Sequence, residues 1–163
     1  MSEQKILIIE IDPIIDSSVK ELCLRPYPGH AKGCPNYNKK DTCPPNTKMF
    51  NEVFDLDYPV FAIINSFDLK SHKEKMHLKH PDWSEKQLAS TRFWYAKAKK
   101  ELRDGINKFL QDHRDYDATS CPEGLGVNVT ETLKNVGILL KWPPEDIAYQ
   151  VALAGRKLDA QSL

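Results

Sequence analysis

The stretch PVFAIINSF, residues 59–67, together with the Asp68 that follows it, decides most of the fold. Its β-branched and aromatic residues, over the length of one strand, predict a buried β-strand. Asp68 then predicts the N-cap of a helix from Leu69 to about Lys79. His80-Pro81 ends this helix, because a residue before proline avoids the α region.

Working outward, the same signals recur on both sides of this unit. Residues 5–11, KILIIEI, predict another buried strand, which Asp12-Pro13 ends. Asp16 or Ser17 can then cap a short helix that runs through Leu22. The apolar residues between Met49 and Leu56 predict a short helix packed on the core.

Downstream, Ser84 and Gln87 form a capping-box pattern that predicts the start of the longest helix, about residues 85–112. Its apolar stripe consists of Leu88, Tyr95, Ala98, Leu102, Ile106 and Phe109. The dense aromatic run of residues 93–95 indicates core rather than a platform for nucleic acid. His72, His77 and His80 are expected at the surface rather than as metal ligands.

The C-terminal third predicts a helix and a final strand. Asn128 and Glu131 resemble a cap and its partner, and Gly137 is placed to stop that helix. Residues 147–154 fit a strand or a helix, and the strand is favoured because only ten residues lie between Pro144 and Gly155. Strands and helices in this order predict an α/β (mixed α+β) fold, with a small mixed sheet packed by helices. We expect one domain over residues 1–155 and a tail over residues 156–163.

Composition restricts the possible functions. The chain has 163 residues, with 23 basic and 23 acidic side chains. This balance argues against a strongly electrostatic binder of nucleic acid or of a membrane surface. The first residues lack the pattern of a signal peptide, and no stretch approaches the length of a spanning helix. We therefore expect a soluble cytoplasmic protein, in which four cysteines suggest metal or redox chemistry more than disulfides.

Three of the cysteines lie in one long segment rich in Pro, Gly and Asn: Cys23, Cys34 and Cys43. The segment has no helical or strand period, and a long irregular loop needs a function or a bound group to hold it. The fourth cysteine, Cys121, follows in a similar turn of sequence SCPEG. These four thiolates are the candidate metal ligands. Cys23 also fits a small buried hydrophobe at a helix end, and Cys121 fits either role.

The spacing narrows the choice of metal without deciding it. It reads C-x10-C-x8-C and lacks the paired short knuckles of common zinc sites. Iron–sulfur clusters are also held by thiolates, and one set of four cysteines favours a 4Fe–4S cluster over a 2Fe–2S cluster. Zinc remains the alternative cofactor. Four thiolates would close the site, whereas three would leave one iron open to a substrate.

Charged side chains near the cysteines are candidates for binding a substrate or supporting the cluster. His30 fits a ligand, a general acid or an ordinary turn histidine. Arg25 and Lys32 would lower thiol pKa values and offset the charge of a cluster, or are simply solvated loop charges. Glu123 lies two residues after Cys121 and can serve as a base if the site is catalytic.

The cysteine segment resembles a known family. The pattern Cys-x3-Tyr-Pro-x-His-x-Lys-Gly-Cys-Pro-Asn-Tyr, then Cys-Pro-Pro, over residues 23–45, is similar to the uncharacterised family labelled predicted metal-binding proteins. Residues 126–132, GVNVTET, resemble a later segment of that family. The resemblance implies metal binding through Cys34 and Cys43 first and then Cys23, with an iron–sulfur cluster and no established reaction. Members often carry further cysteines in the middle of the chain. This sequence has none between Cys43 and Cys121, so a single cluster is expected.

The sequence therefore predicts a metal-binding protein with one iron–sulfur cluster, which can be an open-site enzyme for sulfur transfer or Lewis-acid chemistry. Two alternatives stay open: a zinc-stabilised interaction domain without enzymatic activity, and a thiol redox protein without metal. The partner is an unidentified small molecule or electron carrier. We expect neither a membrane nor nucleic acid as a partner.

Overall fold

The computed structural model describes residues 6–19, 48–140 and 144–158. Its centre is a five-stranded sheet in which every described pairing is antiparallel. The strands are β1 (Ile6–Ile11), β2 (Phe54–Asp55), β3 (Val60–Asp68), β4 (Tyr116–Thr119) and β5 (Ile147–Lys157). The mixed α/β class in a single domain is confirmed, but the sheet is antiparallel where the sequence analysis expected a mixed one.

Strand β5 is the central element of this sheet. Ala154 pairs with both Phe61 of β3 and Ala118 of β4, so β3 and β4 lie along opposite edges of β5. β4 reaches only as far as Leu153, which leaves the edge of residues 147–152 opposite β3 without a pairing strand in the described part of the chain. β5 itself continues to Lys157, and this overturns the expectation that residue 156 begins a tail.

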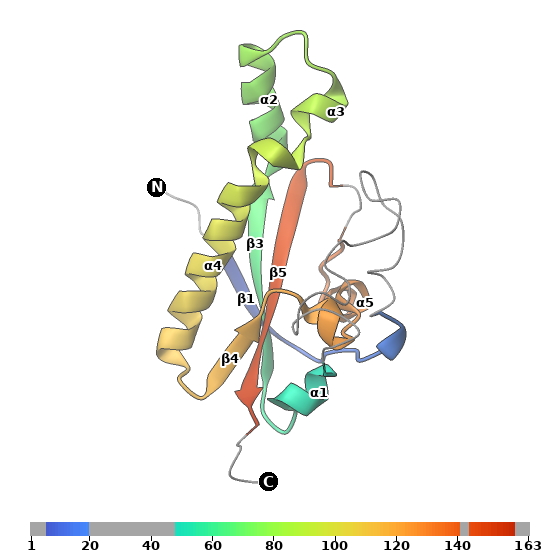
Figure 1. Cartoon of the computed structure of the whole chain (residues 1–163), viewed down its shortest axis with the longest axis vertical. Helices are drawn as coiled ribbons and strands as arrows, with labels where there is room; N and C mark the ends of the chain where they lie inside the picture. Colours follow the sequence, from blue (N-terminus) through green and yellow to red (C-terminus); the bar gives the residue numbers. More distant parts are fainter. Residues whose placement is uncertain (1–5, 20–47, 141–143, 159–163) are drawn as a thin grey trace.

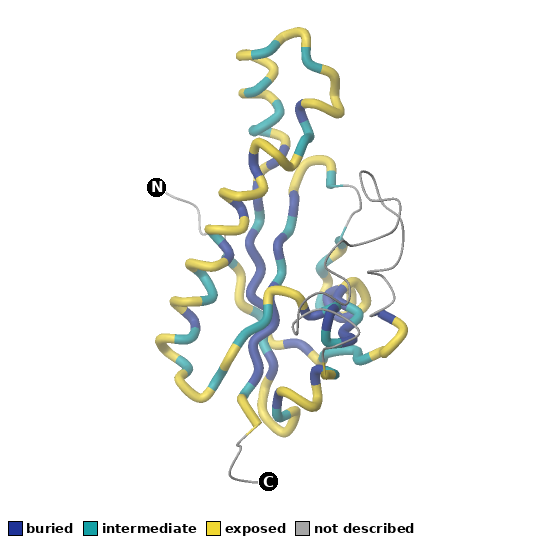
Figure 2. Tube along the Cα trace, in the orientation of Figure 1, coloured by how far each residue is buried: buried dark blue, intermediate teal, exposed yellow. Residues whose placement is uncertain are grey.

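The sheet separates two packed layers, which lie on opposite sides of it in Figure 1. Helix α4 (Tyr95–Asp112) covers one face, where Leu102 and Phe109 pack with Ile63 and Ala152. Helices α1 (Phe50–Val53) and α5 (Val129–Lys134) cover the other face. The larger core cluster lies there and includes Phe50, Ile64, Val127, Leu133 and Leu153. Figure 2 shows the buried residues concentrated along β3, β5 and α5.

Helix boundaries follow their capping signals. Asp68 caps α2 (Leu69–Lys79) by accepting a 3.0 Å hydrogen bond from the Ser71 N–H. Asn128 caps α5 by accepting from the Glu131 N–H at 3.1 Å. Gly137 has φ +84°, the left-handed conformation that glycine adopts past a helix end. These three predictions are confirmed.

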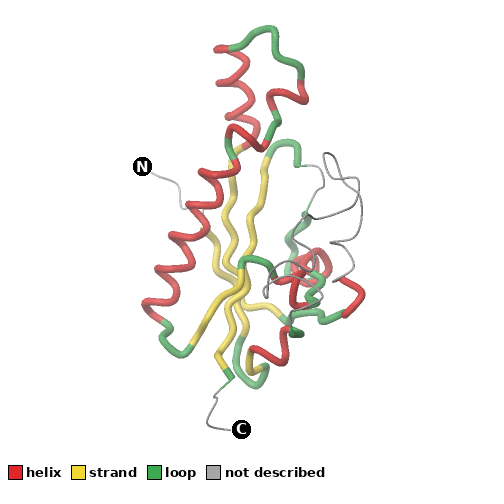
Figure 3. The backbone as a smooth tube through the Cα atoms, in the orientation of Figure 1, coloured by secondary structure: helices red, strands yellow, loops and turns green. Residues whose placement is uncertain are grey.

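The expected long helix over residues 85–112 is wrong. Figure 3 shows it broken into α3 (Glu85–Leu88), a 3₁₀ turn η2 (Thr91–Phe93) and α4. The cause is Trp94, which is buried and stacks on Phe67 with ring centroids 5.0 Å apart. Its indole N–H donates to the Ala89 carbonyl at 3.2 Å, a group that a continuous helix would bond through the backbone of residue 93.

The aromatic run and the histidines are only partly where we expected them. Trp94 belongs to the core, but Phe93 and Tyr95 are each 45% exposed. His77 is exposed, whereas His80 is half-buried and stacks on Trp83 with centroids 3.9 Å apart. The surface expectation is wrong for His72, whose Nε2 atom is fully buried.

Candidate functional site

Cys121 lies where β4 ends and the 3₁₀ helix η3 (Pro122–Leu125) begins. Its side chain is exposed. The turn is fixed by the backbone, because the Cys121 N–H donates to the Thr119 hydroxyl at 3.1 Å and its carbonyl accepts from Gly124 at 3.1 Å. Pro122 fits the first helical position, where no backbone N–H is needed, and it is buried. The predicted stiff turn at this cysteine is therefore present.

The backbone that leads into the cysteine segment attaches to the loop after Cys121. The Asp16 N–H donates to the Gly126 carbonyl at 2.6 Å, and the Asn128 N–H donates to the Ile14 carbonyl at 2.8 Å. Between them Ile15 and Val127 form an isolated antiparallel bridge. Backbone hydrogen bonds therefore fix residues 14–16, which precede the cysteine segment, to residues 126–128.

After the cysteine segment, side chains pack on the same loop. A Cβ atom added to Gly126 would lie 2.8 Å from the Met49 Sδ atom, so this side chain packs directly on the glycine. The next residue, Phe50, is fully buried against Phe54, with ring centroids 4.6 Å apart, in the cluster that contains Val127. Residues 14–16 and 49–50 therefore converge on residues 126–128, five residues after Cys121.

The structure places two of the predicted site residues, Cys121 and Glu123. The others lie outside the residues that the structure describes: Cys23, Arg25, His30, Lys32, Cys34 and Cys43. Among the described residues, no group of three His, Cys, Asp or Glu side chains gathers to hold a metal.

Glu123 is half-buried in the wall of a pocket beside Cys121. Its burial raises the pKa of the carboxyl group above the usual range, against a smaller opposing effect of a backbone hydrogen bond. A carboxyl group of this kind holds its proton longer than a solvated one as the pH rises, which suits a general acid. The sequence singled out Glu123 as a base, and its surroundings favour the acid form.

The pocket has a volume of about 350 Å³ and follows the edge of β5 that no described strand pairs. Ser120 and Glu123 reach it from either side of Cys121, and Tyr149 and Gln150 reach it from β5. Apolar groups, including Leu140 and Val129, form much of the remaining wall. Its size lies within the range of small-molecule sites, and polar groups are few and localised, as in such sites.

The sequence analysis missed a buried polar cluster behind this pocket. The Asn65 side-chain amide donates to Gln150 Oε1 at 2.8 Å, and to the Ala98 carbonyl and Glu101 Oε2 at 3.2 Å each. Asn65 and Gln150 are register partners on β3 and β5, so both point to the face covered by α4. The available signal was that each is a polar residue within an otherwise apolar strand run.

Among residues 6–19, 48–140 and 144–158, none of the helices has the length and apolar character of a bilayer-spanning segment. A comparison of the chain with protein-family models, with curated proteins and with solved structures finds no match.

Proposed function

We propose that this chain is a metal-binding protein that holds one iron–sulfur cluster through Cys23, Cys34, Cys43 and Cys121. The observation that carries the proposal is the convergence described above. Before the cysteine segment, the backbone of residues 14–16 bonds to residues 126–128, and after it the Met49 side chain packs on Gly126. Cys121 opens the same loop with an exposed side chain, so the described residues that flank the segment meet the loop of the fourth cysteine, as one shared site would require.

The donor set agrees with this choice. Soft thiolates select iron–sulfur, zinc or copper(I) over magnesium and calcium. Cys34, Cys43 and Cys121 each precede a proline, which fixes the turn and adds no competing N–H. The resemblance of the cysteine segment to predicted metal-binding proteins supports the same assignment, as does the absence of the paired knuckles of common zinc sites.

The pocket beside Cys121 favours an enzyme that acts on a small molecule over a purely structural site. If Cys121 is not a ligand, a cluster held by Cys23, Cys34 and Cys43 would supply an open iron as a Lewis acid. In the pocket, Glu123 can give a proton to a bound molecule, since burial raises the pKa of its carboxyl group. Ser120 and Tyr149 add hydroxyl groups that can orient it. Sulfur transfer and Lewis-acid elimination both fit these groups.

The test is the content of iron, zinc and acid-labile sulfide in protein purified without oxygen, compared with Cys121→Ser and Ser120→Ala. Ser120 is the exposed neighbour of Cys121, so its variant controls for disturbance of the turn. We expect iron and sulfide in the parent chain and in Ser120→Ala. In Cys121→Ser we expect a cluster lost or altered in its visible and electron paramagnetic resonance spectra.

Other results would contradict the proposal in distinct ways. Zinc without sulfide would replace it with the zinc-stabilised interaction domain. A chain without metal, with a disulfide that forms reversibly at Cys121, would replace it with the thiol redox protein. A cluster left unchanged in both amount and spectrum by Cys121→Ser would remove Cys121 from the ligand set.

A further inference from the structure

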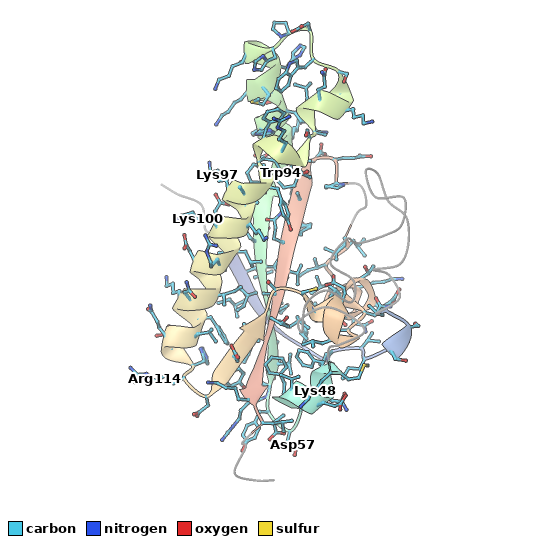
Figure 4. The ribbon with its side chains drawn as sticks, in the orientation of Figure 1. Lys48, Asp57, Trp94, Lys97, Lys100 and Arg114 are labelled. Carbon is cyan, nitrogen blue, oxygen red and sulfur yellow. The ribbon has the colours of Figure 1, made fainter. Side chains whose placement is uncertain are left out.

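A second hollow lies away from the cysteines, where α2 and the start of α4 meet the ends of β3 and β5. Its volume is about 800 Å³, within the range of small-molecule sites. Four lysines line it: Lys70, Lys75 and Lys79 from α2 and Lys97 from α4. Figure 4 shows Lys97 and Trp94 at the upper end of α4, next to the lobe formed by α2 and α3.

The lysines are not explained by packing or by ion pairs. Only Leu69 is buried along α2, so the helix has no apolar face to hold against the sheet. Lys73 of α2 pairs with Glu85 at 2.9 Å. In contrast, no carboxylate among the described residues lies within ion-pair distance of the four lysines of the hollow.

Acidic groups in the hollow offset only part of this charge. Two aspartates line it, Asp68 and Asp146. The Asp68 carboxylate is engaged as the cap of α2, where it accepts from the Ser71 N–H at 3.0 Å and the Ser71 hydroxyl at 2.8 Å. Four ammonium groups against two carboxylates leave an excess of positive charge in a concave site, which attracts an anion.

His72 lies in the wall of the same hollow. Its Nε2 atom is buried, and its ring packs near Phe67, with centroids 5.9 Å apart. Burial, followed by the charges of Lys75 and Lys97, lowers the pKa of His72 below its usual value. Lysines of α2 and α4 therefore act electrostatically on the same part of the hollow.

We infer that this hollow binds a small molecule that carries two or more phosphate groups, held by Lys75, Lys79 and Lys97. Lysine is a point charge that suits several phosphate oxygens without fixed geometry. Cys121, the one cysteine among the described residues, does not line the hollow. The inference therefore does not depend on the metal site.

A single-stranded nucleic acid fits the hollow less well, although it has the same phosphate chemistry. Such partners need exposed aromatic faces on which bases stack. Of the aromatic side chains that line the hollow, Phe67 and Trp94 are buried, and Phe93, which is 45% exposed, offers a single face rather than a series of stacking faces. The concave lysine cluster therefore favours a compact polyphosphate over an extended polymer.

The experiment is calorimetric titration of the full chain with inorganic tripolyphosphate and with a nucleoside triphosphate, at low and at moderate salt. The test variant is Lys75→Gln/Lys97→Gln, since both side chains are exposed and the fold should tolerate the change. Lys100→Gln/Lys108→Gln is the matched control, because it removes two charges from α4 outside the hollow. Circular dichroism and thermal melts establish that each variant folds.

We expect the test variant to weaken binding roughly tenfold or more, the control variant to change it less than about threefold, and salt to weaken it throughout. Absence of binding at millimolar tripolyphosphate would overturn the inference. Equal losses in the test and control variants would also overturn it, and so would tighter binding of a single-stranded oligonucleotide than of either small probe.

Discussion

Gly126 lies where residues 14–16 and Met49, on either side of the cysteine segment, meet the loop after Cys121, so Gly126→Ala tests that junction. Its φ is +80°, and a side chain in this left-handed region costs about 1–2 kcal/mol. The new methyl group would also meet the Met49 side chain, with the Sδ atom 2.8 Å away. Because these atoms are the far end of a flexible side chain, displacing them adds only the low end of the overpacking cost, about 1 kcal/mol. We expect Gly126→Ala to lower the free energy of unfolding by about 2–3 kcal/mol.

Gly137 provides the matched control. Its φ is +84°, but no atom lies within 4 Å of an added Cβ. Gly137→Ala should therefore cost only the backbone term, about 1–2 kcal/mol. For a chain of this size, each kcal/mol lowers Tm by about 2–4 °C, so the two variants are separable by calorimetry and by urea denaturation.

A third variant isolates the Met49 contact. Met49→Ala in the Gly126→Ala background should recover part of the loss, because the shortened side chain leaves room for the methyl group. The reasoning is refuted if Gly126→Ala and Gly137→Ala lose the same stability, or if Met49→Ala adds its full cost to that of Gly126→Ala, since two changes that do not interact add.

Three further predictions address the pocket and its supports. Burial raises the pKa of Glu123 in the folded state, so the contribution of this carboxyl group to stability is present at low pH and is lost as the pH rises. The Tm of Glu123→Gln minus the Tm of the parent should therefore grow between about pH 4 and pH 7. A difference that stays constant with pH would contradict this. Asn128→Ala removes the cap of α5 and should cost about 1 kcal/mol, against almost no loss in Asn128→Asp, by urea denaturation. Asn65→Leu leaves the Gln150 oxygen without its donor and should cost about 1–3 kcal/mol; Asn65→Leu/Gln150→Leu should be more stable than the single variant.

Features encoded by neighbouring residues were predictable from the sequence. The junction of β3 and α2 at Asp68 and the start of α5 at Asn128 rest on hydrogen bonds that span three residues. The turn at Cys121 likewise follows from its own residues, including the proline after it. In each case the interaction that decides the structure is visible within a short window of sequence.

Features decided by distant contacts were missed. Residues 85–112 carry a continuous helical pattern, yet Trp94 breaks the helix by packing on Phe67, a strand residue far away in sequence. β4 is four residues long, contains an aspartate and exists because β5 pairs with it. Arg156 looked like part of a charged tail, but its guanidinium lies 3.8 Å from the centroid of the Tyr58 ring and its backbone pairs with Tyr116.

The same distinction explains what could be known of the candidate site. The sequence marked the four cysteines as candidate ligands, because soft thiolates bind metals such as iron and zinc. The attachment of the flanking residues to the loop after Cys121 depends on Ile15 pairing with Val127 and on Met49 packing against Gly126, contacts that no local pattern encodes. A site built from both the cysteine segment and the Cys121 loop would depend on the stability of the contacts between residues 14–16, Met49 and residues 126–128. If Cys121 is a ligand, Gly126→Ala should therefore lose iron at lower temperature than Gly137→Ala, although neither glycine can coordinate a metal.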